Sequence, residues 1–227
     1  MTDALAEHPS PQQQEEPPCC QRLAVPPAPR GTRRIMPILT VIIGSTRPGR
    51  AGLPIGEWFV DRVRSHGGFA VEVADLAEIR LPLMDEPNNP RLRQYVHQHT
   101  KNWSARIDRA DAVVVVTPEY NHGYPAPLKN AIDYLHEEWR DKPVGFVSYG
   151  GVAAGTRAVE QLKQVLTTLR TVPVVESVNI PFHIQFIDDG RVQANEIIEQ
   201  AADAMLDELL RVYAALRPLR TAATRAA

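Results

Sequence analysis

Along residues 37–218, continuous apolar runs alternate with segments in which apolar residues recur at helical spacing. Runs of apolar, largely β-branched residues predict strands at 38–43, 69–73, 112–116, 143–147 and 172–175. Apolar residues recur at helical spacing after each run, with Trp58, Trp103 and Leu166 at positions expected to face the core. Continuous apolar strands are buried on both faces, so five of them interleaved with helices predict a parallel sheet covered on both sides.

Two segments depart from this repeat. The stretch 180–192 contains Asp188-Asp189-Gly190, which predicts a hairpin turn in an excursion after the fifth strand. The stretch 81–93 contains Pro82, Pro87 and Pro90 and is expected to be a long irregular connection, a kind of segment that is often functional.

The ends of the chain differ from the repeat in composition. Residues 1–36 are rich in Pro, Gln, Glu and Ala and are predicted to form a disordered tail, because little in them can be buried. Cys19 and Cys20 lie there and are interpreted as exposed thiols. A further hypothesis starts translation at Met36, which an intact mass would test. The domain is expected at 37–218, followed by a C-terminal tail at 219–227.

Overall charge and hydropathy narrow the function. The 25 basic and 27 acidic side chains give a net charge of −2, which provides no electrostatic argument for nucleic-acid binding. No apolar run approaches the ~20 residues of a membrane span, and the first residues lack a secretory pattern. We therefore expect a cytoplasmic protein with no membrane partner. The sequence also lacks the spacing of a metal site, so none is expected.

The densest group of chemical signals follows the strand at 112–116. Pro118, Pro125 and Pro127 restrict the backbone, and Gly123 is expected to supply the conformational freedom for a turn. An aromatic face and several hydrogen-bonding groups meet in this loop, at Glu119, Tyr120, Asn121 and His122. A flat heteroaromatic ligand would need that combination.

Two further loops follow the first and fourth strands. G-S-T-R-P-G-R at 44–50 precedes a helix and predicts an anion cradle suited to a terminal phosphate. It is neither a Walker loop nor G-x-G-x-x-G, and the alternative is a tight turn with solvated arginines. S-Y-G-G at 148–151 would let main-chain groups approach a ligand closely, with Tyr149 either covering one side of it or lying in the core.

The order 2-1-3-4-5, typical of doubly wound sheets, makes the first, third and fourth strands neighbours. Their loops would then emerge side by side at the switch point, where such sheets bind ligands. A phosphate cradle beside a flat polar and aromatic slot describes a mononucleotide with a large planar ring. Flavin mononucleotide (FMN) fits this description better than an adenine nucleotide.

The three motifs, in this order and spacing, resemble those of the NAD(P)H-dependent FMN reductases, a flavodoxin-like family with quinone, chromate and azo-dye reductases among its members. The resemblance covers residues 38–171 and implies a flavodoxin-like three-layer sandwich. It also implies FMN phosphate at Ser45, Arg47 and the backbone up to Arg50. The isoalloxazine ring would lie against Pro118, Glu119, Tyr120, Asn121 and Gly123, with its other edge lined by Ser148, Tyr149, Gly150 and Gly151.

The resemblance further implies hydride transfer from NADPH or NADH to flavin, and then reduction of a quinone, free flavin or similar small-molecule electron acceptor. The cofactor carries this chemistry, so no catalytic side chain is expected. Backbone amides of residues 119–123 are expected to contact the polar ring edge. The family tends to form homodimers or homotetramers with the flavin near the interface.

Other readings of the same features are an electron-carrier flavodoxin and a phospho-receiver domain. Carriers are usually strongly acidic and have a different phosphate loop, and receivers need acidic residues after the first and third strands, where this chain has Gly44-Ser45 and Thr117-Pro118.

Lys129 and Asp133 share one helix face and are expected to form a surface pair, with a subunit contact as the alternative.

Overall fold

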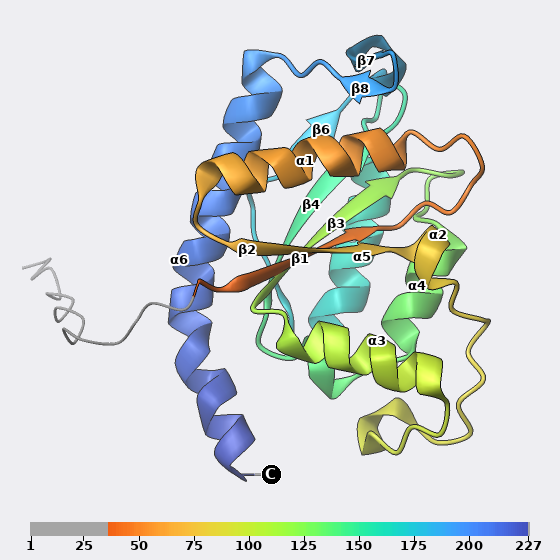
Figure 1. The fold of residues 1–227 in the computed structure, drawn as a ribbon, viewed down its shortest axis with the longest axis vertical. Helices are drawn as coiled ribbons and strands as arrows, with labels where there is room; N and C mark the ends of the chain where they lie inside the picture. Colours follow the sequence, from red (N-terminus) through yellow and green to blue (C-terminus); the bar gives the residue numbers. More distant parts are fainter. Residues whose placement is uncertain (1–35, 227) are drawn as a thin grey trace, which may run out of the picture. The chain divides into compact units, whose positions relative to one another are not determined.

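A parallel sheet of order β2-β1-β3-β4-β5 forms the centre of the protein (Figure 1). This computed structural model describes residues 36–226, so all but the last residue of the tail predicted at 1–36, including both cysteines, lies outside the described residues. The predicted fold class and strand order are confirmed.

The elements, in chain order, are β1 (Ile38–Ile43), α1 (Gly52–His66), β2 (Ala70–Asp75), α2 (Leu76–Ile79), η1 (Pro90–Leu92), α3 (Gln98–Arg109), β3 (Ala112–Pro118), α4 (Ala126–Asp133), η2 (Glu137–Trp139), β4 (Pro143–Tyr149), α5 (Thr156–Thr168), β5 (Val172–Pro173), β6 (Val178–Ile180), η3 (His183–Phe186), β7 (Ile187–Asp188), β8 (Arg191–Val192) and α6 (Glu196–Ala226).

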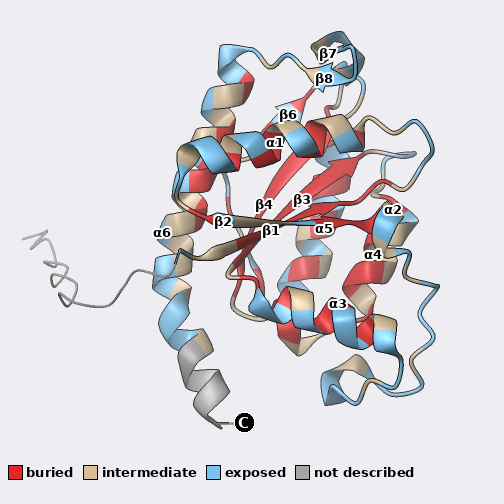
Figure 2. Cartoon of the chain, in the orientation of Figure 1, coloured by how far each residue is buried: buried red, intermediate tan, exposed pale blue. Residues whose placement is uncertain are grey.

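The central strands are buried on both faces, as their unbroken apolar sequences predict (Figure 2). One hydrophobic cluster joins the sheet to α1 and α6, and a second joins it to α3, α4 and α5, which gives three layers. The register pairs Ile43 with Val116 and Val116 with Val147. The carboxyl ends of β1, β3 and β4 therefore meet at one edge of the sheet.

The fifth strand is divided. The sequence predicts one strand at 172–175, whereas β5 and β6 each pair in parallel with β4 at different heights. The amides of Val172 and Val174 donate to β4, so Pro173 between them faces the open edge of the sheet, where its missing amide hydrogen costs no ladder bond. The chain then leaves β4 at Val175, which is 87% exposed in the segment between the two strands. Helix α3 begins at Gln98, two residues after Val96, which is exposed.

The predicted hairpin is confirmed. Strands β7 and β8 are antiparallel and are joined by Asp189 and Gly190, with φ angles of 43° and 72°. Two left-handed residues in a two-residue connection are typical of tight hairpins.

Helix α6 continues past residue 218, where the sequence analysis ends the domain, and reaches Ala226 with Pro218 inside it. A tertiary anchor offsets the lost helical hydrogen bond, because Arg220 donates to the Asp111 carboxylate at 2.9 Å and to the Ala110 carbonyl at 3.0 Å. Within the described residues, no helix combines the length and apolar character needed to cross a membrane.

Candidate functional site

Three loops meet at the carboxyl edge of the sheet. The first loop (residues 44–50) follows β1, the second (118–123) includes the last residue of β3, and the third (148–151) begins with the last two residues of β4. A hydrogen bond of 2.7 Å between the hydroxyl groups of Ser45 and Tyr120 joins the first two loops. The structure thus brings the predicted motifs together.

The second loop is a tight turn. The Tyr120 amide donates to the Gly123 carbonyl at 2.8 Å, and the Gly123 amide donates to the Tyr120 carbonyl at 3.0 Å. Between them, Asn121 and His122 have φ angles of 51° and 69°. The left-handed conformations thus fall on Asn121 and His122, and the expectation that Gly123 supplies the freedom is wrong.

This turn changes which amides can face a ligand. Its two hydrogen bonds use the amides of Tyr120 and Gly123, whereas the amides of Asn121 and His122 at the tip take no part in them. The amides of residues 119–123 were all expected to contact a ligand, but those of Tyr120 and Gly123 are already used inside the turn. Asn121 and His122 are both exposed and offer the tip of the turn to solvent.

Helix α5 holds the second loop. Glu119 points toward its first turn, where one carboxylate oxygen pairs with the Arg157 guanidinium at 2.5 Å and the other accepts from the Arg157 amide at 3.2 Å. One helical turn further, the Gln161 side-chain amide donates to the His122 carbonyl at 3.0 Å. The Glu119 side chain is 7% exposed, so its carboxylate is occupied within the protein.

The arginines of the first loop differ. Arg47 is exposed. Arg50 instead forms an ion pair with Asp75 at the end of β2, and both side chains are largely buried, at 12% and 4% exposure. Asp75 also accepts a hydrogen bond from the Ala77 amide at the start of α2. Apart from Arg50, the polar side chains of this loop are those of Ser45, Thr46 and Arg47, of which Ser45 is buried and bonded to Tyr120.

In the third loop, two side chains turn inward. The Ser148 hydroxyl donates to the Asn179 side-chain oxygen on β6 at 2.9 Å. Tyr149 is 3% exposed and belongs to the core, which decides between the two positions that the sequence leaves open. The third loop therefore presents backbone to solvent at Gly151, where an added Cβ would meet nothing within 4 Å.

The Tyr149 hydroxyl lies beneath the first loop. A Cβ built on Gly52 would lie 2.6 Å from its oxygen, so glycine is required at that point of α1. Among the described residues the hydroxyl makes no hydrogen bond of normal geometry, and the neighbouring Ser45 hydroxyl is bonded to Tyr120. Burial raises the pKa of Tyr149, which keeps its proton available as a donor.

Sequence reasoning missed the residues that support these loops. Besides Arg157 and Gln161, they include His183, whose Nδ1 lies 2.9 Å from the Gly150 carbonyl and whose ring packs edge-on against Tyr149 at 5.1 Å. The only signal in the sequence was the four-residue spacing of Arg157 and Gln161 directly after the third loop. His183 and Asn179 are more than 25 positions from their partners, and no local pattern reveals them.

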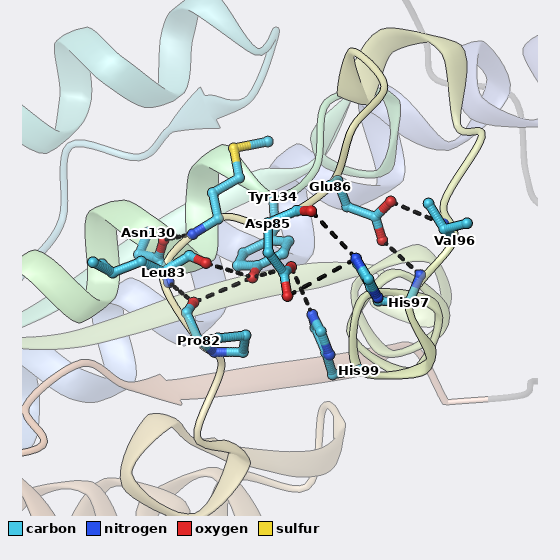
Figure 3. A network of polar contacts seen from close by, with 10 residues as sticks. Pro82, Leu83, Asp85, Glu86, Val96, His97, His99, Asn130 and Tyr134 are labelled. Carbon is cyan, nitrogen blue, oxygen red and sulfur yellow. Dashed lines mark hydrogen bonds and ion pairs between the residues drawn. The ribbon is translucent and has the colours of Figure 1, made fainter.

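The proline-rich connection after α2 is fixed by a polar network (Figure 3). The Asp85 carboxylate accepts hydrogen bonds from Tyr134 at 2.9 Å and lies 3.0 Å from His99 Nε2. Burial acts to raise the pKa of Asp85, but the hydrogen bonds from His99 and Tyr134 and the nearby imidazoles lower it on balance. The carboxylate of Glu86 accepts hydrogen bonds from the backbone amides of Val96 and His97, just before α3 begins.

Helix α4 carries the predicted surface pair. The Lys129 ammonium lies 2.5 Å from the Asp133 carboxylate one turn later, and both side chains are 42% exposed. This confirms the surface pair. Near the start of the same helix, Pro127 lines a pocket of about 240 Å³ that also includes Thr46 of the first loop and the exposed Arg80.

A larger hollow lies elsewhere. It has a volume of about 750 Å³ and is lined by α1, the outer strand β2 and the β7–β8 hairpin, and none of its lining residues belongs to the three loops. The three loops instead present exposed residues at 47–49, 120–122 and 151 along the carboxyl edge of the sheet, and we call this surface the ledge.

Comparison with known proteins places this arrangement in a family. The model of the NADPH-dependent FMN reductases matches residues 37–185, which include all three loops. This chain belongs to the NADPH-dependent FMN reductase family. The resemblance drawn from the motifs is confirmed, and with it the expected cofactors, FMN and NAD(P)H.

Three individual proteins show the extent of the similarity. An NAD(P)H-dependent FMN reductase of Schizosaccharomyces pombe is 40% identical over 152 residues, which are 65% of this chain and 76% of that protein. An FMN-dependent NADPH-azoreductase of Staphylococcus saprophyticus is 25% identical over 175 residues, covering 75% and 92%. The solved structure of FerB, a flavoenzyme NAD(P)H:(acceptor) oxidoreductase from Paracoccus denitrificans, has a TM-score of 0.62 at 23% identity, covering 78% and 97%, and shares the fold.

Proposed function

We propose that the three loops hold FMN across the carboxyl edge of the sheet. The phosphate is assigned to Ser45, Arg47 and the backbone up to Arg50, and the ring to residues 118–123, with Gly150 and Gly151 at its other edge. The observation that carries this proposal is the hydrogen bond between Ser45 and Tyr120, because it ties the phosphate-type loop to the aromatic turn.

The residues present fit FMN. The buried Tyr149 hydroxyl is an unsatisfied donor beside the start of α1, where the helix dipole also favours an anion. The tip amides of Asn121 and His122 supply donors for the polar edge of a ring. Glu119, Ser148 and the Tyr149 ring act behind the binding surface, because each is buried against the protein.

The reaction we propose is reduction of a quinone, free flavin or similar planar acceptor at the expense of NAD(P)H. Bound FMN would supply the hydride and electron transfer between the nicotinamide and the second substrate. The protein binds and orients both partners, and the donors of the second loop stabilise negative charge at the ring edge. The similarity to an enzyme named as an azoreductase supports a broad range of aromatic acceptors.

We further propose that NADPH is preferred to NADH. Arg47 and Arg80 are exposed near the first loop, and Arg80 lines the pocket of about 240 Å³ with Thr46. An exposed guanidinium is suited to a 2′-phosphate because it donates several charge-assisted hydrogen bonds.

A homodimer or homotetramer is the assembly we propose. Apolar side chains are exposed along the connection between α2 and α3, at Leu83, Met84, Leu92 and Val96, and the ledge is open in the single chain. Burial of such side chains favours association. Light scattering during size-exclusion chromatography would give the mass, and a monomer at all concentrations would contradict this assembly.

The decisive experiment is anaerobic titration of the purified, FMN-reconstituted protein with NADPH and with NADH. We expect bleaching of the flavin absorbance, more readily with NADPH, followed by steady turnover when a quinone is added. A protein that stays colourless after reconstitution would remove the assigned site. Flavin that is reduced only by a partner protein, without turnover of NAD(P)H, would indicate an electron carrier instead.

A further inference from the structure

Arg157 makes three contacts with the second loop from the first turn of α5. Its Nη2 pairs with the Glu119 carboxylate at 2.5 Å, and its Nη1 lies 2.8 Å from His122 Nε2. Its backbone amide donates to the other Glu119 oxygen at 3.2 Å. One side chain thus joins the base of the turn, at Glu119, to its tip, at His122.

The contact with His122 determines where the imidazole carries its proton. A guanidinium has only donors, so the His122 nitrogen that faces it must accept. Nε2 is therefore unprotonated, and in the neutral ring the proton resides on Nδ1. The Gln161 side chain, which donates to the His122 carbonyl at 3.0 Å, fixes the backbone of the same residue.

The backbone makes this support necessary. Asn121 and His122 are both left-handed, a conformation that costs energy for residues with a Cβ, although Asn and His adopt it more readily than most. The turn's two internal hydrogen bonds close it at Tyr120 and Gly123 but leave the tip exposed. Arg157 and Gln161 hold this tip on α5 from outside.

We propose that Arg157 is a positioning residue for the flavin site: it holds the second loop in its binding shape and, by occupying Nε2 of His122, leaves Nδ1–H as the donor that the turn offers to a bound ligand. This inference rests on the assignment of the flavin ring to residues 118–123. It adds to that assignment a residue of α5, about 35 positions later in the chain, and a defined tautomer.

A simpler role for Arg157 would be neutralisation of Glu119, whose carboxylate is only 7% exposed. The two roles predict different results for Arg157→Lys. A lysine can neutralise Glu119, but its single ammonium replaces two nitrogens that reach separate partners. Under our proposal lysine restores folding without restoring the His122 tautomer.

The first test needs no flavin. Long-range ¹H–¹⁵N spectra of the flavin-free protein, at a pH where imidazoles are neutral, report which nitrogen of each histidine is protonated. We expect Nδ1–H for His122 in the wild type and a mixture of tautomers in Arg157→Met and Arg157→Lys. The signal is assigned by its loss in His122→Asn. An unchanged tautomer in Arg157→Met would overturn the proposal.

The second test measures FMN affinity by fluorescence quenching. Loss of the charge-assisted contacts in Arg157→Met is expected to raise the FMN dissociation constant about tenfold. Arg211→Met is the matched control, because Arg211 also forms an arginine–carboxylate contact, with Glu208 of its own helix α6 and not with the second loop. Its FMN affinity should remain at the wild-type value.

These outcomes separate the inference from the proposed function. A wild type that fails to bind FMN removes the flavin site, whereas the tautomer measured without flavin still tests the role of Arg157. If the wild type binds FMN and a folded Arg157→Met binds it equally well, the positioning role alone is refuted. Circular dichroism of each variant confirms that it is folded.

Discussion

Two arginines three positions apart in the first loop have different roles in this structure. Arg50 forms a buried ion pair with Asp75, whereas Arg47 is exposed. The sequence predicts the loop and its positive charge, but it could not distinguish the two side chains, because Asp75 lies 25 positions away. The same limit applies to Glu119: its place in the motif is evident, but its partner on α5 is not.

Replacement of each arginine tests this distinction. Arg47→Ala should raise the FMN dissociation constant about tenfold and leave the free energy of unfolding nearly unchanged, since it removes one charged hydrogen bond to phosphate. Arg50→Ala should instead lower the free energy of unfolding by about 3 kcal/mol, because it leaves the Asp75 charge buried without its partner. Fluorescence titration and urea denaturation measure the two quantities. Equal FMN affinities in wild type and Arg47→Ala would remove the phosphate assignment.

Lys142 provides a second test at this scale. The side chain is 2% exposed and donates to the carbonyls of Ile107 and Asp108. Burial, together with repulsion from Arg220, lowers the pKa of Lys142 from 10.5 to about 7, although Asp108, Asp111 and Glu138 act in the opposite direction. The folded protein therefore binds fewer protons than the unfolded chain between these two values.

The free energy of unfolding should consequently rise with pH across that window, because the unfolded state binds more protons there. The contribution of Lys142 to the slope is at most about 1.4 kcal/mol per pH unit. Urea denaturation of wild type and Lys142→Met between neutral pH and pH 10 checks this, and Lys142→Met should give the flatter profile. Parallel profiles would show that the amine titrates normally.

Among the elements, the turn before α5 has the strictest backbone requirement. Gly155 has a φ of 82°, and a Cβ built on it would lie 2.9 Å from the Tyr149 amide nitrogen. Gly151, four positions earlier, has open space around it. Sequence alone marked Gly150 and Gly151 as the important pair, because a close approach between Gly155 and β4 has no local signature.

Alanine at these two positions should therefore have different effects on stability and on FMN binding. Gly155→Ala should lower the free energy of unfolding by about 2 kcal/mol through backbone strain and contact with β4. Gly151→Ala should change stability by less than about 0.5 kcal/mol. It should nonetheless weaken FMN binding, if the ring approaches the third loop there as proposed. Thermal denaturation and FMN titration of both variants check this, and normal FMN affinity in Gly151→Ala would exclude Gly151 from the site.

Most elements of the fold follow from hydrophobic periodicity. The strands 38–43, 112–116 and 143–147 are predicted because they are buried on both faces and therefore almost wholly apolar, with Thr40 as the polar exception. The division of the fifth strand was missed, since the chain leaves β4 at the exposed Val175 and pairs with it again from Val178, at the edge of the sheet, where burial constrains the sequence less. The length of α6 was missed because its anchor, Arg220 with Asp111, is a tertiary contact.

For the whole molecule, FMN binding and folding are linked. A ligand that binds only the folded state adds about 2.7 kcal/mol of stability at a free concentration of one hundred times its dissociation constant. FMN should therefore raise the melting temperature by about 5–10 °C for a protein of this size. Riboflavin, which lacks the phosphate, should give a smaller shift, and Arg47→Ala should narrow the difference. Equal shifts with FMN and riboflavin in the wild type would exclude a phosphate site.

The Asp111 carboxylate accepts hydrogen bonds from the Ile38 amide, where β1 begins, and from Arg220 of α6. The start of the sheet and the late part of the last helix are therefore joined at the amino edge of the sheet. The three loops occupy the opposite edge. If the protein is attached to a solid surface through a tag that follows α6, the ledge should face away from that surface. Immobilisation of the enzyme on a solid surface by a C-terminal tag should therefore preserve access for soluble dyes and nicotinamides.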